Sequence, residues 1–452
     1  MSKMLTQNSA LLLPADVSFV INELEKSGYE AFAVGGCVRD SLRGESPHDW
    51  DICTSALPED TLRVFAGSNV IETGLKHGTV TVILDHKPYE ITTYRSEGEY
   101  SDNRRPDTVS FLTDIRGDLS RRDFTINAMA YSARTGVVDF FGGIGDLENG
   151  VVKCVGDPDK RFGEDSLRIM RAMRFASTLK MTIDGETAKA MLHNRALLGK
   201  ISAERIASEL NKMIMGAYVY DVFSEHAQII FEIIPELAPT LNFAQDNPHH
   251  SFDVFTHTVL SIAYAPFDLC VRLALLFHDI AKPECHTHED GVSHFYGHAQ
   301  VSVDIARSVL SRLKYDNETS STVKKLVLYH DSDMLPSRKH IKRWLNRLGE
   351  AKLRQLMEVK RADVMAQSEL KQNERLKGLH DVSLVIDEIL QEQQCFSLKD
   401  LAVDGRDLLA AGIPQGRQIG EIMKLLLDLV IEEEIENSKD ALLSYVDVLR
   451  SK

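Results

Sequence analysis

Two carboxylates in this sequence are spaced so that both could bind the same pair of metal ions. Asp49 and Asp51 are two positions apart. We expect them on a strand, where residues i and i+2 point to the same face. Mg²⁺ prefers such carboxylates together with substrate phosphates, and two aligned carboxylates can hold two Mg²⁺ ions for in-line phosphoryl transfer. The pattern predicts a magnesium site at these two aspartates.

A glycine pair precedes the aspartates. The apolar run 31–34 is a predicted strand that ends at Gly35-Gly36, and a helix is expected from about Val38. Glycines let the backbone approach a polyphosphate, and a helix N-terminus presents N–H groups to anions. Arg39 in the first turn adds a charged donor. Either motif alone is common in turns and on surfaces, but their order favours a triphosphate site.

The segment AFAVGGCVRDSLRGESPHDWDIC resembles the nucleotidyltransferase signature of the DNA polymerase β superfamily. Among the members of that superfamily, the segment resembles class II tRNA nucleotidyltransferases and bacterial poly(A) polymerases specifically. The resemblance implies a third carboxylate on a neighbouring strand, and Glu90 in YEITTYR is the candidate. Polymerase chemistry needs a base or a further metal ligand near the attacking 3′-hydroxyl. An ordinary exposed strand glutamate is the alternative.

The segment SRRDFTINAMAY resembles the RRD motif of the same family. The resemblance implies that Arg121, Arg122 and Asp123 contact the ribose and phosphates of the nucleotide. Asn127 follows four residues later, one turn away if a helix starts here. A charged capping segment is the alternative.

The segment RFGEDSLRIMRAMRF resembles the EDxxR motif of the family. We expect one helix over 164–174, with Asp165 beside Arg168. The resemblance implies that an Asp acceptor and an Arg donor read the Watson–Crick edge of a base and so select C, then A. A helix that is only salt-bridged is the alternative. The residues assigned to this motif are Glu164, Asp165, Arg168, Arg171 and Arg174.

Three other segments extend the resemblance. The charged stretch 95–107 resembles the flexible loop of CCA-adding members. The stretch 200–214 is similar to a helical neck motif, and 401–423 is similar to the tail of Gram-positive-type members. In that tail, glycine and proline positions predict helix-terminating turns near the region that binds the tRNA elbow.

The histidine-rich middle, residues 257–363, resembles an HD domain, the metal phosphohydrolase module. An adjacent His and Asp, joined by distant His and Asp residues, can surround one or two divalent ions, including a transition metal. A water bound there could attack a phosphoester. The alternative is a degenerate domain that serves as a helical spacer. The candidate ligands are His257, His278, Asp279, His298, His330 and Asp363.

Composition sets limits on the class of protein. The chain has 452 residues, 43% hydrophobic and 26% charged, which predicts three or four globular modules. No apolar run approaches the roughly 20 residues that span a bilayer. No signal peptide is recognisable, so we expect a cytoplasmic protein without a membrane part and with reduced cysteines. The net charge of −15 still permits an RNA partner, because binding depends on local clusters such as the arginines at 116–122 and 161–174.

The predicted fold is an α+β nucleotidyltransferase head with a polymerase β-like mixed sheet, followed by mostly helical domains. The expected domains are a head at 1–147, a helical neck at 148–246, an HD domain at 247–370 and a helical body and tail at 371–452. The head is expected to contain helices at 16–28 and 59–66 and strands at 31–34, 51–54, 79–84, 89–95 and 109–112.

The resemblance implies a CCA tRNA nucleotidyltransferase that uses Mg²⁺, with tRNA, ATP and CTP as partners. A poly(A) polymerase or a CC-adding enzyme of the same family is the nearest alternative, and the loop at 95–107 disfavours the CC-only enzyme. An HD phosphohydrolase with an RNA-binding head is the alternative from another class. The pair Asp49 and Asp51 argues against it, since an adaptor needs no aligned carboxylates. The sequence indicates no oligomeric state.

Overall fold

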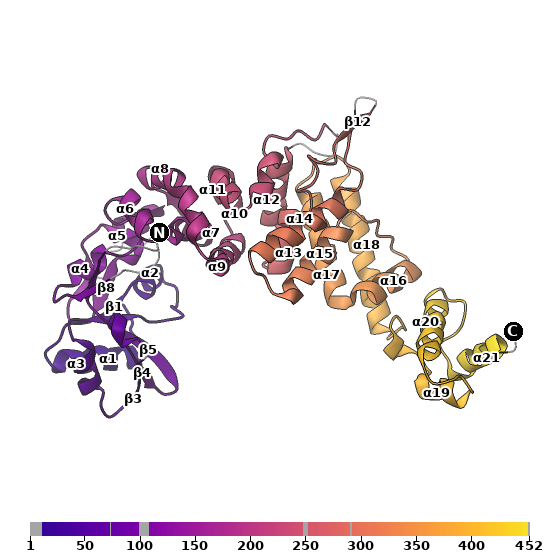
Figure 1. The fold of residues 1–452 in the computed structure, drawn as a ribbon, viewed down its shortest axis with the longest axis horizontal. Helices are drawn as coiled ribbons and strands as arrows, with labels where there is room; N and C mark the ends of the chain where they lie inside the picture. Colours follow the sequence, from indigo (N-terminus) through magenta and orange to yellow (C-terminus); the bar gives the residue numbers. More distant parts are fainter. Residues whose placement is uncertain (1–10, 73, 99–107, 247–251, 290–291, 451–452) are drawn as a thin grey trace. The chain divides into compact units, whose positions relative to one another are not determined.

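The protein forms two compact units, Met1–Pro235 and Glu236–Lys452 (Figure 1). The division falls before residue 246, where the sequence placed the end of the neck, and the finer four-domain division remains a prediction. The computed structural model describes residues 11–72, 74–98, 108–246, 252–289 and 292–450.

The first unit contains a seven-stranded mixed sheet in the order β3-β4-β5-β2-β1-β8-β9. β1 is antiparallel to both β2 and β8, whereas β2 and β5 are parallel. The predicted α+β head with a mixed sheet is confirmed. The strands are β1 Ala31–Val34, β2 Ile52–Thr54, β3 Asn69–Ile71, β4 Thr79–Leu84, β5 Lys87–Thr93, β8 Met129–Ser132 and β9 Gly136–Asp139.

Apolar periodicity explains the core of the head. All four residues of β1 are buried, as expected for a central strand covered on both faces. Helix α1 (Ala15–Lys26) buries Val17, Val20, Ile21 and Leu24, the stripe that its sequence spacing predicts. The predicted strand at 109–112 exists as β7 (Val109–Phe111), but it pairs with β6 (Arg95–Glu97) outside the main sheet.

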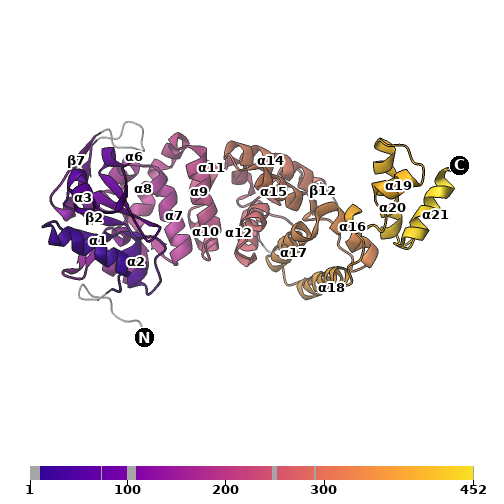
Figure 2. The ribbon, with the colours of Figure 1, turned by 90° about the horizontal axis from the view of Figure 1, so that it is seen from below.

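Helices surround the sheet and continue the chain beyond it (Figures 1 and 2). α7 packs against α9, so charged side chains on these two helices can contact one another. A short parallel pair, β10 (Val151–Val152) and β11 (Thr182–Ile183), lies within the neck at 148–246, which the sequence predicted to be helical. The helices of this unit are α2 Gly36–Leu42, α3 Pro58–Val64, α4 Ile115–Ser120, α5 Gly143–Asn149, α6 Pro158–Glu164, α7 Leu167–Leu179, α8 Gly185–Asn194, α9 Ala203–Ile214, α10 Val219–Glu225 and α11 Ala227–Ile233.

In the described residues of the second unit, the strands are those of one hairpin, β12 (Thr287–Glu289) and β13 (Val292–His294), and the other regular elements are helices. Its C-terminal helices have a core of their own that includes Leu408, Leu426 and Leu442. The helices are α12 Val254–Tyr264, α13 Leu269–Phe277, α14 His298–Arg312, α15 Asn317–Tyr329, α16 Arg338–Leu348, α17 Glu350–Met365, α18 Gln372–Gln391, α19 Gly405–Ala410, α20 Arg417–Ile431 and α21 Lys439–Arg450.

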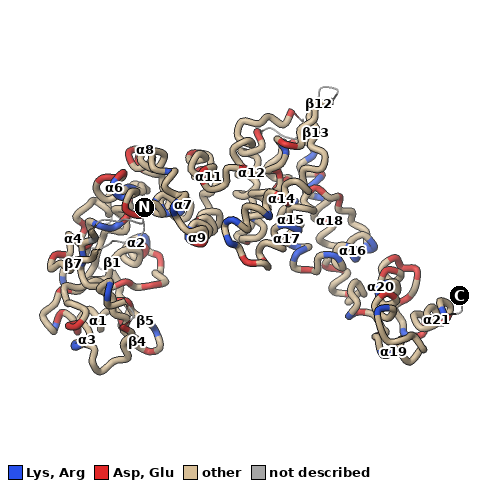
Figure 3. The backbone as a smooth tube through the Cα atoms, in the orientation of Figure 1, with Lys and Arg blue, Asp and Glu red and all other residues tan. Residues whose placement is uncertain are grey.

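The placement of charged residues, apolar helices and cysteines agrees with what the composition predicted. Acidic and basic residues are interspersed over both units rather than gathered in one basic stripe (Figure 3). Within the described ranges, no helix is both long and apolar enough to cross a bilayer. The six cysteines, all of them in described segments, are free thiols.

Candidate active site

The turn between β1 and α2 requires glycine at position 35. Gly35 has a φ of 84°, in the region where side chains are strained, and it caps α2. A Cβ at this position would lie 2.8 Å from Nη1 of Arg122. The predicted strand, glycine pair and helix are therefore present, and the turn brings Arg122 from the RRD motif against the backbone of Gly35.

The aspartate pair lies beside this turn, although not on a strand as the sequence predicted. β2 begins at Ile52, so Asp49 and Asp51 lie in the segment before it, which has no regular secondary structure. The Asp51 carbonyl nevertheless accepts a hydrogen bond from the Val34 amide at 3.0 Å, which continues the β1–β2 pairing by one residue. Asp51 is thus fixed next to the end of β1.

The two aspartates form a local concentration of negative charge. Both residues are exposed overall. Desolvation of its carboxylate raises the pKa of Asp51, Arg122 opposes that rise, and the neighbouring Asp49 adds to it. Two hard oxygen donors that repel each other fit a bound Mg²⁺, which would relieve the repulsion.

Glu90 lies on the strand next to β2, as predicted. The parallel register pairs Ile52 with Ile91, so one residue earlier on each strand Glu90 lies opposite Asp51. In the described part of the chain, however, Asp49, Asp51 and Glu90 do not bring three ligand atoms within 4.8 Å of one another. The strand places Glu90 near the pair without completing a three-carboxylate cluster.

A buried polar chain connects the glycine turn to the RRD motif. Arg39 Nη1 donates to Asn127 Oδ1 at 2.6 Å, and Asn127 Nδ2 donates to Asp123 Oδ1 at 3.1 Å. All three residues are buried. The structure thus joins Arg39, predicted in the triphosphate site, to two residues that were predicted from a separate motif.

Asp118 was missed in the sequence. Its carboxylate is buried and lies 2.9 Å from Nη2 of Arg121 and 3.5 Å from Nη2 of Arg122. It therefore orients both arginines of the RRD motif. The i,i+3 and i,i+4 spacing of the three residues was a signal that could have identified it.

Asp123 connects the RRD motif to α7. Its Oδ2 accepts from Nε and Nη2 of Arg171 at 2.8 and 2.6 Å. Burial raises the pKa of Asp123, but the charge of Arg171 and the hydrogen bonds from Asn127 and Arg171 outweigh burial and lower it well below its usual value. Asp123 is therefore held as a carboxylate.

The EDxxR segment is not one helix. α6 ends at Glu164, Asp165 is extended with φ −135° and ψ 103°, and α7 begins at Leu167. The prediction of a continuous helix over 164–174 was wrong. Asp165 Oδ1 accepts from the Leu167 amide at 3.1 Å, so its side chain stabilises the first turn of a new helix.

The predicted partnership of Asp165 with Arg168 is also replaced by other contacts. Arg168 Nη1 donates to Glu164 Oε2 at 2.8 Å, and its Nη2 donates to the carbonyl of Arg121 at 3.1 Å. Asp165 Oδ2 instead accepts from Nη2 of Arg205 at 3.0 Å. Arg205 lies on α9 and was not among the predicted residues.

Three arginines surround the ring of Phe175 on α7. The guanidinium carbons of Arg174, Arg39 and Arg171 lie 4.1, 5.0 and 5.5 Å from the ring centroid. Arg174 is also 3.3 Å from Oε2 of the buried Glu209 on α9. The predicted residues from all three motifs therefore converge within the first unit. Residues 99–107 of the predicted flexible loop, with Arg104 and Arg105, lie outside the described residues.

A cluster of histidine and aspartate side chains lies in the second unit. All six residues predicted from the HD resemblance come together there, from α12, α14, α17 and the ends of α13 and α15. The Nε2 atom of His257 lies 2.9 Å from Asp363 Oδ1 and 3.5 Å from Asp279 Oδ2. His278 Nε2 lies 3.2 Å from the same Asp279 oxygen.

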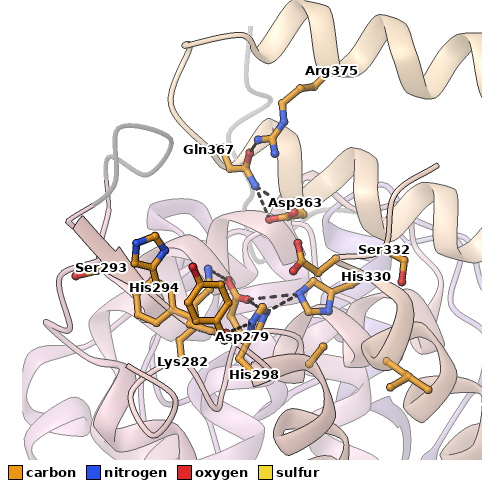
Figure 4. Close-up of a pocket in the computed structure, with 16 residues that line it drawn as sticks. Asp279, Lys282, Ser293, His294, His298, His330, Ser332, Asp363, Gln367 and Arg375 are labelled. Carbon is orange, nitrogen blue, oxygen red and sulfur yellow. Dashed lines mark hydrogen bonds and ion pairs between the residues drawn. The ribbon is translucent and has the colours of Figure 1, made fainter. Parts of the chain in front are cut away.

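Asp279 is shared by two sets of histidines. Its other oxygen, Oδ1, lies 3.4 Å from Nε2 of His298 and 3.6 Å from Nε2 of His330 (Figure 4). The two sets, His257–His278–Asp279 and Asp279–His298–His330, each have ligand atoms within 4.8 Å of one another and consist of buried residues. Lys282 Nζ is 2.7 Å from Asp279 Oδ2 and supplies a positive charge.

The backbone fixes the orientation of the imidazoles. The Nδ1 atoms of His278, His298 and His330 lie 2.7–2.8 Å from carbonyl oxygens three residues earlier. With Nδ1 donating to a carbonyl, Nε2 is the ring nitrogen that faces the carboxylates, and it could bind a metal once it has lost its proton. Burial lowers the pKa of His278, but Asp279 and Asp363 outweigh burial and raise it to about 10.

A cavity of about 530 Å³ opens beside this centre. Both metal-type carboxylates, Asp279 and Asp363, face it, together with the cationic groups of Lys282 and Arg375 (Figure 4). A small anionic molecule could therefore reach the centre. This cavity and the Asp49–Asp51 site belong to different units.

Family models match most of the chain. The "Poly A polymerase head domain" matches residues 31–153. A model for an RNA and SrmB binding site of polymerase A matches 180–241, and the "tRNA nucleotidyltransferase domain 2" model matches 284–446. None of these three models describes the histidine cluster as an HD domain.

Individual proteins match over nearly the full length. The CCA-adding enzyme of Lactobacillus helveticus is 34% identical over 95% of this chain and 96% of its own. The CCA-adding enzyme of Pediococcus pentosaceus is 32% identical over 96% of this chain and 98% of its own. The crystal structure of the Bacillus stearothermophilus CCA-adding enzyme in complex with CTP aligns with a TM-score of 0.68 and 26% identity, covering 96% of both chains.

Proposed function

The chain belongs to the family of CCA-adding enzymes, which makes it a nucleotidyltransferase, and we propose that it adds CMP, CMP and AMP to the 3′ end of tRNA from CTP and ATP. The observation that carries the proposal is the convergence of the glycine turn, the aspartate pair and the RRD and EDxxR residues in one unit. We further propose that the reaction takes place in the cytoplasm. We keep the division into a head (1–147), a neck (148–246), an HD domain (247–370) and a body and tail (371–452).

In this proposal, Asp49 and Asp51 hold Mg²⁺, and Glu90 is the third carboxylate near the attacking hydroxyl. When bound, Mg²⁺ supplies Lewis-acid stabilisation of charge on the phosphoryl oxygens. Arg122 lies against the Gly35 backbone, so a triphosphate at this turn would meet its guanidinium. Asp118 keeps Arg122 oriented toward that position.

Gly36 and Arg39 complete the triphosphate grip, and Arg121, Asp123 and Asn127 support it. Arg39 and Asn127 are joined by a short, buried hydrogen bond, so the position of one depends on the other. A buried polar network that is fully paired is rigid, which favours a preformed site. The nucleotide would then bind without reordering these side chains.

Base selection is assigned to the segment at 164–174. Cytosine and adenine both carry an exocyclic amino group, whereas uracil and guanine carry a carbonyl at the matching position. The Asp165 carboxylate can accept from the amino group, and the guanidiniums of Arg168, Arg171 and Arg174 are the donor candidates. Glu164 pairs with Arg168 and keeps its charge near the site.

The test uses a tRNA that ends just before the CCA sequence, incubated with each nucleoside triphosphate alone and with CTP and ATP together. Sequencing of the products should show addition of C, C and A, and then a stop. Repeated A additions would identify the poly(A) polymerase, and a stop after CC would identify the CC-adding enzyme. No addition from any triphosphate would contradict the proposal.

We also propose a divalent-metal centre in the second unit, with a transition metal such as Mn²⁺ or Zn²⁺ held by the four histidines and two aspartates. The observation that favours it is the set of Nδ1 contacts to backbone carbonyls, which directs Nε2 atoms toward Asp279 and Asp363. Imidazole and carboxylate donors suit transition metals. The adjoining cavity supports a phosphohydrolase activity on a small anionic substrate.

Metal analysis of the purified protein tests this second proposal. One or two equivalents of a divalent metal per chain, removed by chelation and restored by dialysis, are expected. Hydrolysis of a chromogenic phosphodiester should follow the metal content. A protein that takes up no metal from Mn²⁺ or Zn²⁺ solutions would leave the domain as a helical spacer.

A further inference from the structure

The joint between α17 and α18 carries a chain of polar side chains beside the cavity of the second unit. Asp363 lies in the last turn of α17, and Gln367 Nε2 donates to its Oδ1 and Oδ2 at 3.2 and 3.1 Å (Figure 4). Gln367 Oε1 in turn accepts from Nη1 of Arg375 on α18. The chain therefore leads from a candidate metal ligand to an exposed arginine that lines the cavity.

Gln367 has one favourable orientation between these two groups. Its amide NH2 group faces the carboxylate, and its amide oxygen faces the guanidinium. The reversed amide would place its oxygen against the carboxylate and its NH2 group against the guanidinium, so both hydrogen bonds would be lost. Gln367 therefore links Arg375 to Asp363 in a defined geometry, with Asp363 Oδ1 2.9 Å from Nε2 of His257.

Arg375 carries a charge that no described carboxylate compensates. Within the described residues, it donates to the neutral amide of Gln367 and forms no ion pair. Lys282, the other lysine or arginine that lines the cavity, is by contrast 2.7 Å from Asp279 Oδ2 and donates to Gln245 Oε1 at 2.8 Å. The guanidinium of Arg375 is therefore the group that can attract an anion into the cavity.

The contact with Gln367 leaves most of this guanidinium unused. Nη1 donates to Gln367, whereas Nε and Nη2 donate to none of the residues that the structure describes. These two nitrogens form a planar fork that matches two oxygens of a phosphate group, and charge-assisted pairs of this kind are strong. The hydrolysis proposed for this centre acts on a phosphoester, so a phosphate group is the anion that would meet the fork.

We propose that Arg375 binds the phosphate group of the substrate in this cavity, and that Gln367 holds the guanidinium beside the candidate metal ligand Asp363. The chain from Arg375 through Gln367 to Asp363 thereby joins the anion-binding group to the metal centre. Arg375 would determine the affinity for phosphate, and Gln367 would position both of its neighbours. This inference rests on the metal centre and the phosphohydrolase activity proposed for the second unit.

Arg375→Met in the full-length, Mn²⁺-loaded protein is the direct test, with inorganic phosphate as the probe. Isothermal titration calorimetry measures the dissociation constant for phosphate. Because hydrogen bonds to charged groups are the stronger ones, this constant should rise by about tenfold or more in R375M. Thermal midpoints confirm folding, and R375Q replaces R375M if that variant does not fold.

Three matched variants separate the charge from the contact with Gln367. Arg375→Gln retains a donor for Gln367 without the charge and should bind phosphate as weakly as R375M. Arg375→Lys keeps the charge but not the fork, and should recover part of the affinity. Lys377→Met removes an exposed positive charge from the same helix, outside the lining of the cavity, and should leave the dissociation constant unchanged.

Gln367→Met breaks the chain at its centre. Outer partners of metal-ligating carboxylates typically support metal affinity by about 10–100-fold. Binding of Mn²⁺, followed through the electron paramagnetic resonance signal of the free ion, should therefore weaken by about tenfold or more in Q367M, together with the binding of phosphate. In R375M, where Gln367 still contacts Asp363, the affinity for Mn²⁺ should change by less.

The outcomes are distinct. Wild-type phosphate affinity in R375M, or an equal loss in K377M, would overturn this inference. So would wild-type affinities for both Mn²⁺ and phosphate in Q367M, or a wild-type protein that takes up Mn²⁺ and then binds no phosphate. A wild-type protein that takes up no Mn²⁺ would instead contradict the proposed metal centre, and this inference with it.

Discussion

Asp123 Oδ2 accepts two hydrogen bonds from a single guanidinium, at 2.8 Å from Nε and 2.6 Å from Nη2 of Arg171. This ion pair joins the RRD segment to α7. The carboxylate is nearly inaccessible, with 9% of its side chain exposed, whereas Arg171 is 33% exposed. Asp123 therefore depends on Arg171 for the compensation of its charge.

We predict that Arg171→Met destabilises the first unit by about 3 kcal/mol, because it leaves a buried carboxylate unpaired. Asp123→Asn should cost less, since the amide is neutral. Urea unfolding monitored by circular dichroism measures both. Arg134→Met, which breaks a surface pair with Glu25, is the matched control and should cost less than about 1 kcal/mol. An equally small effect of Arg171→Met would show that the pair contributes little.

The same pair predicts a dependence of stability on pH. The folded pKa of Asp123 is depressed, so its contribution is complete above the unfolded pKa of about 4 and is lost as the pH falls from there toward the folded pKa. The gap in stability between wild type and Asp123→Asn should thus be largest near pH 7 and shrink below about pH 4. Urea midpoints of both proteins across this range test the sign. A gap that widens in acid would refute the assignment.

Asp49→Ala and Asp51→Ala should each lower nucleotide incorporation by several powers of ten, since metal-held carboxylates act on the charge of the transition state. Binding of tRNA, measured by filter retention, should change little. Glu59→Ala removes an exposed carboxylate in the first turn of α3 and should leave turnover intact. Retention of more than roughly a tenth of wild-type turnover in either aspartate variant would contradict the two-metal assignment.

Gly35→Ala and Gly44→Ala form a matched pair. Both glycines have a positive φ, 84° and 78°, so both substitutions carry a similar backbone strain of about 1 kcal/mol. A Cβ at Gly44 meets open space, whereas one at Gly35 would displace Arg122. Single-turnover incorporation should therefore fall strongly in the Gly35 variant only, with a raised KM for the triphosphate. Equal losses in the two variants would mean that strain alone is responsible.

His278→Ala combined with Asp279→Ala should abolish divalent-metal retention in the second unit and any phosphohydrolase activity. Nucleotide incorporation should persist, because the two sites belong to different units. Plasma mass spectrometry measures the metal. His286→Ala is the control, since His286 lies 2.9 Å from the Ser293 hydroxyl and outside the cluster. Loss of both activities in a folded double variant would show that the units depend on each other.

Local patterns predicted the parts of the structure that depend on neighbours in sequence. The apolar stripe of α1 and the buried run of β1 follow directly from side-chain periodicity. The turn at Gly35 follows from the conformational freedom of glycine. The set of HD residues was identified through resemblance, whereas the anchoring of Nδ1 atoms by backbone carbonyls depends on tertiary structure and was not predicted.

The break between α6 and α7 shows why the rest was missed. Glu164 and Arg168 do pair, as an i,i+4 spacing on one helix predicts, yet the chain leaves the helix between them. Asp165 followed by an apolar helical run was an available N-terminal signal. The contact of Asp165 with Arg205 could not be predicted, since it depends on how α7 packs against α9. The start of β2 at Ile52, after both aspartates, likewise depends on how the strands pair in the sheet and was not predicted.

The order of the strands has a consequence for hydrogen exchange. Gly35 follows β1, Asp51 precedes β2 and Asn127 precedes β8, and these three strands are adjacent in the middle of the sheet. Amide protons in central, buried strands exchange only through the largest opening events of a domain. Fraying of the edge strands β3 and β9 would leave Gly35, Asp51 and Asn127 in their positions relative to one another. The candidate active site should therefore open only when the head itself unfolds, and its amides should be among the slowest to exchange in this unit.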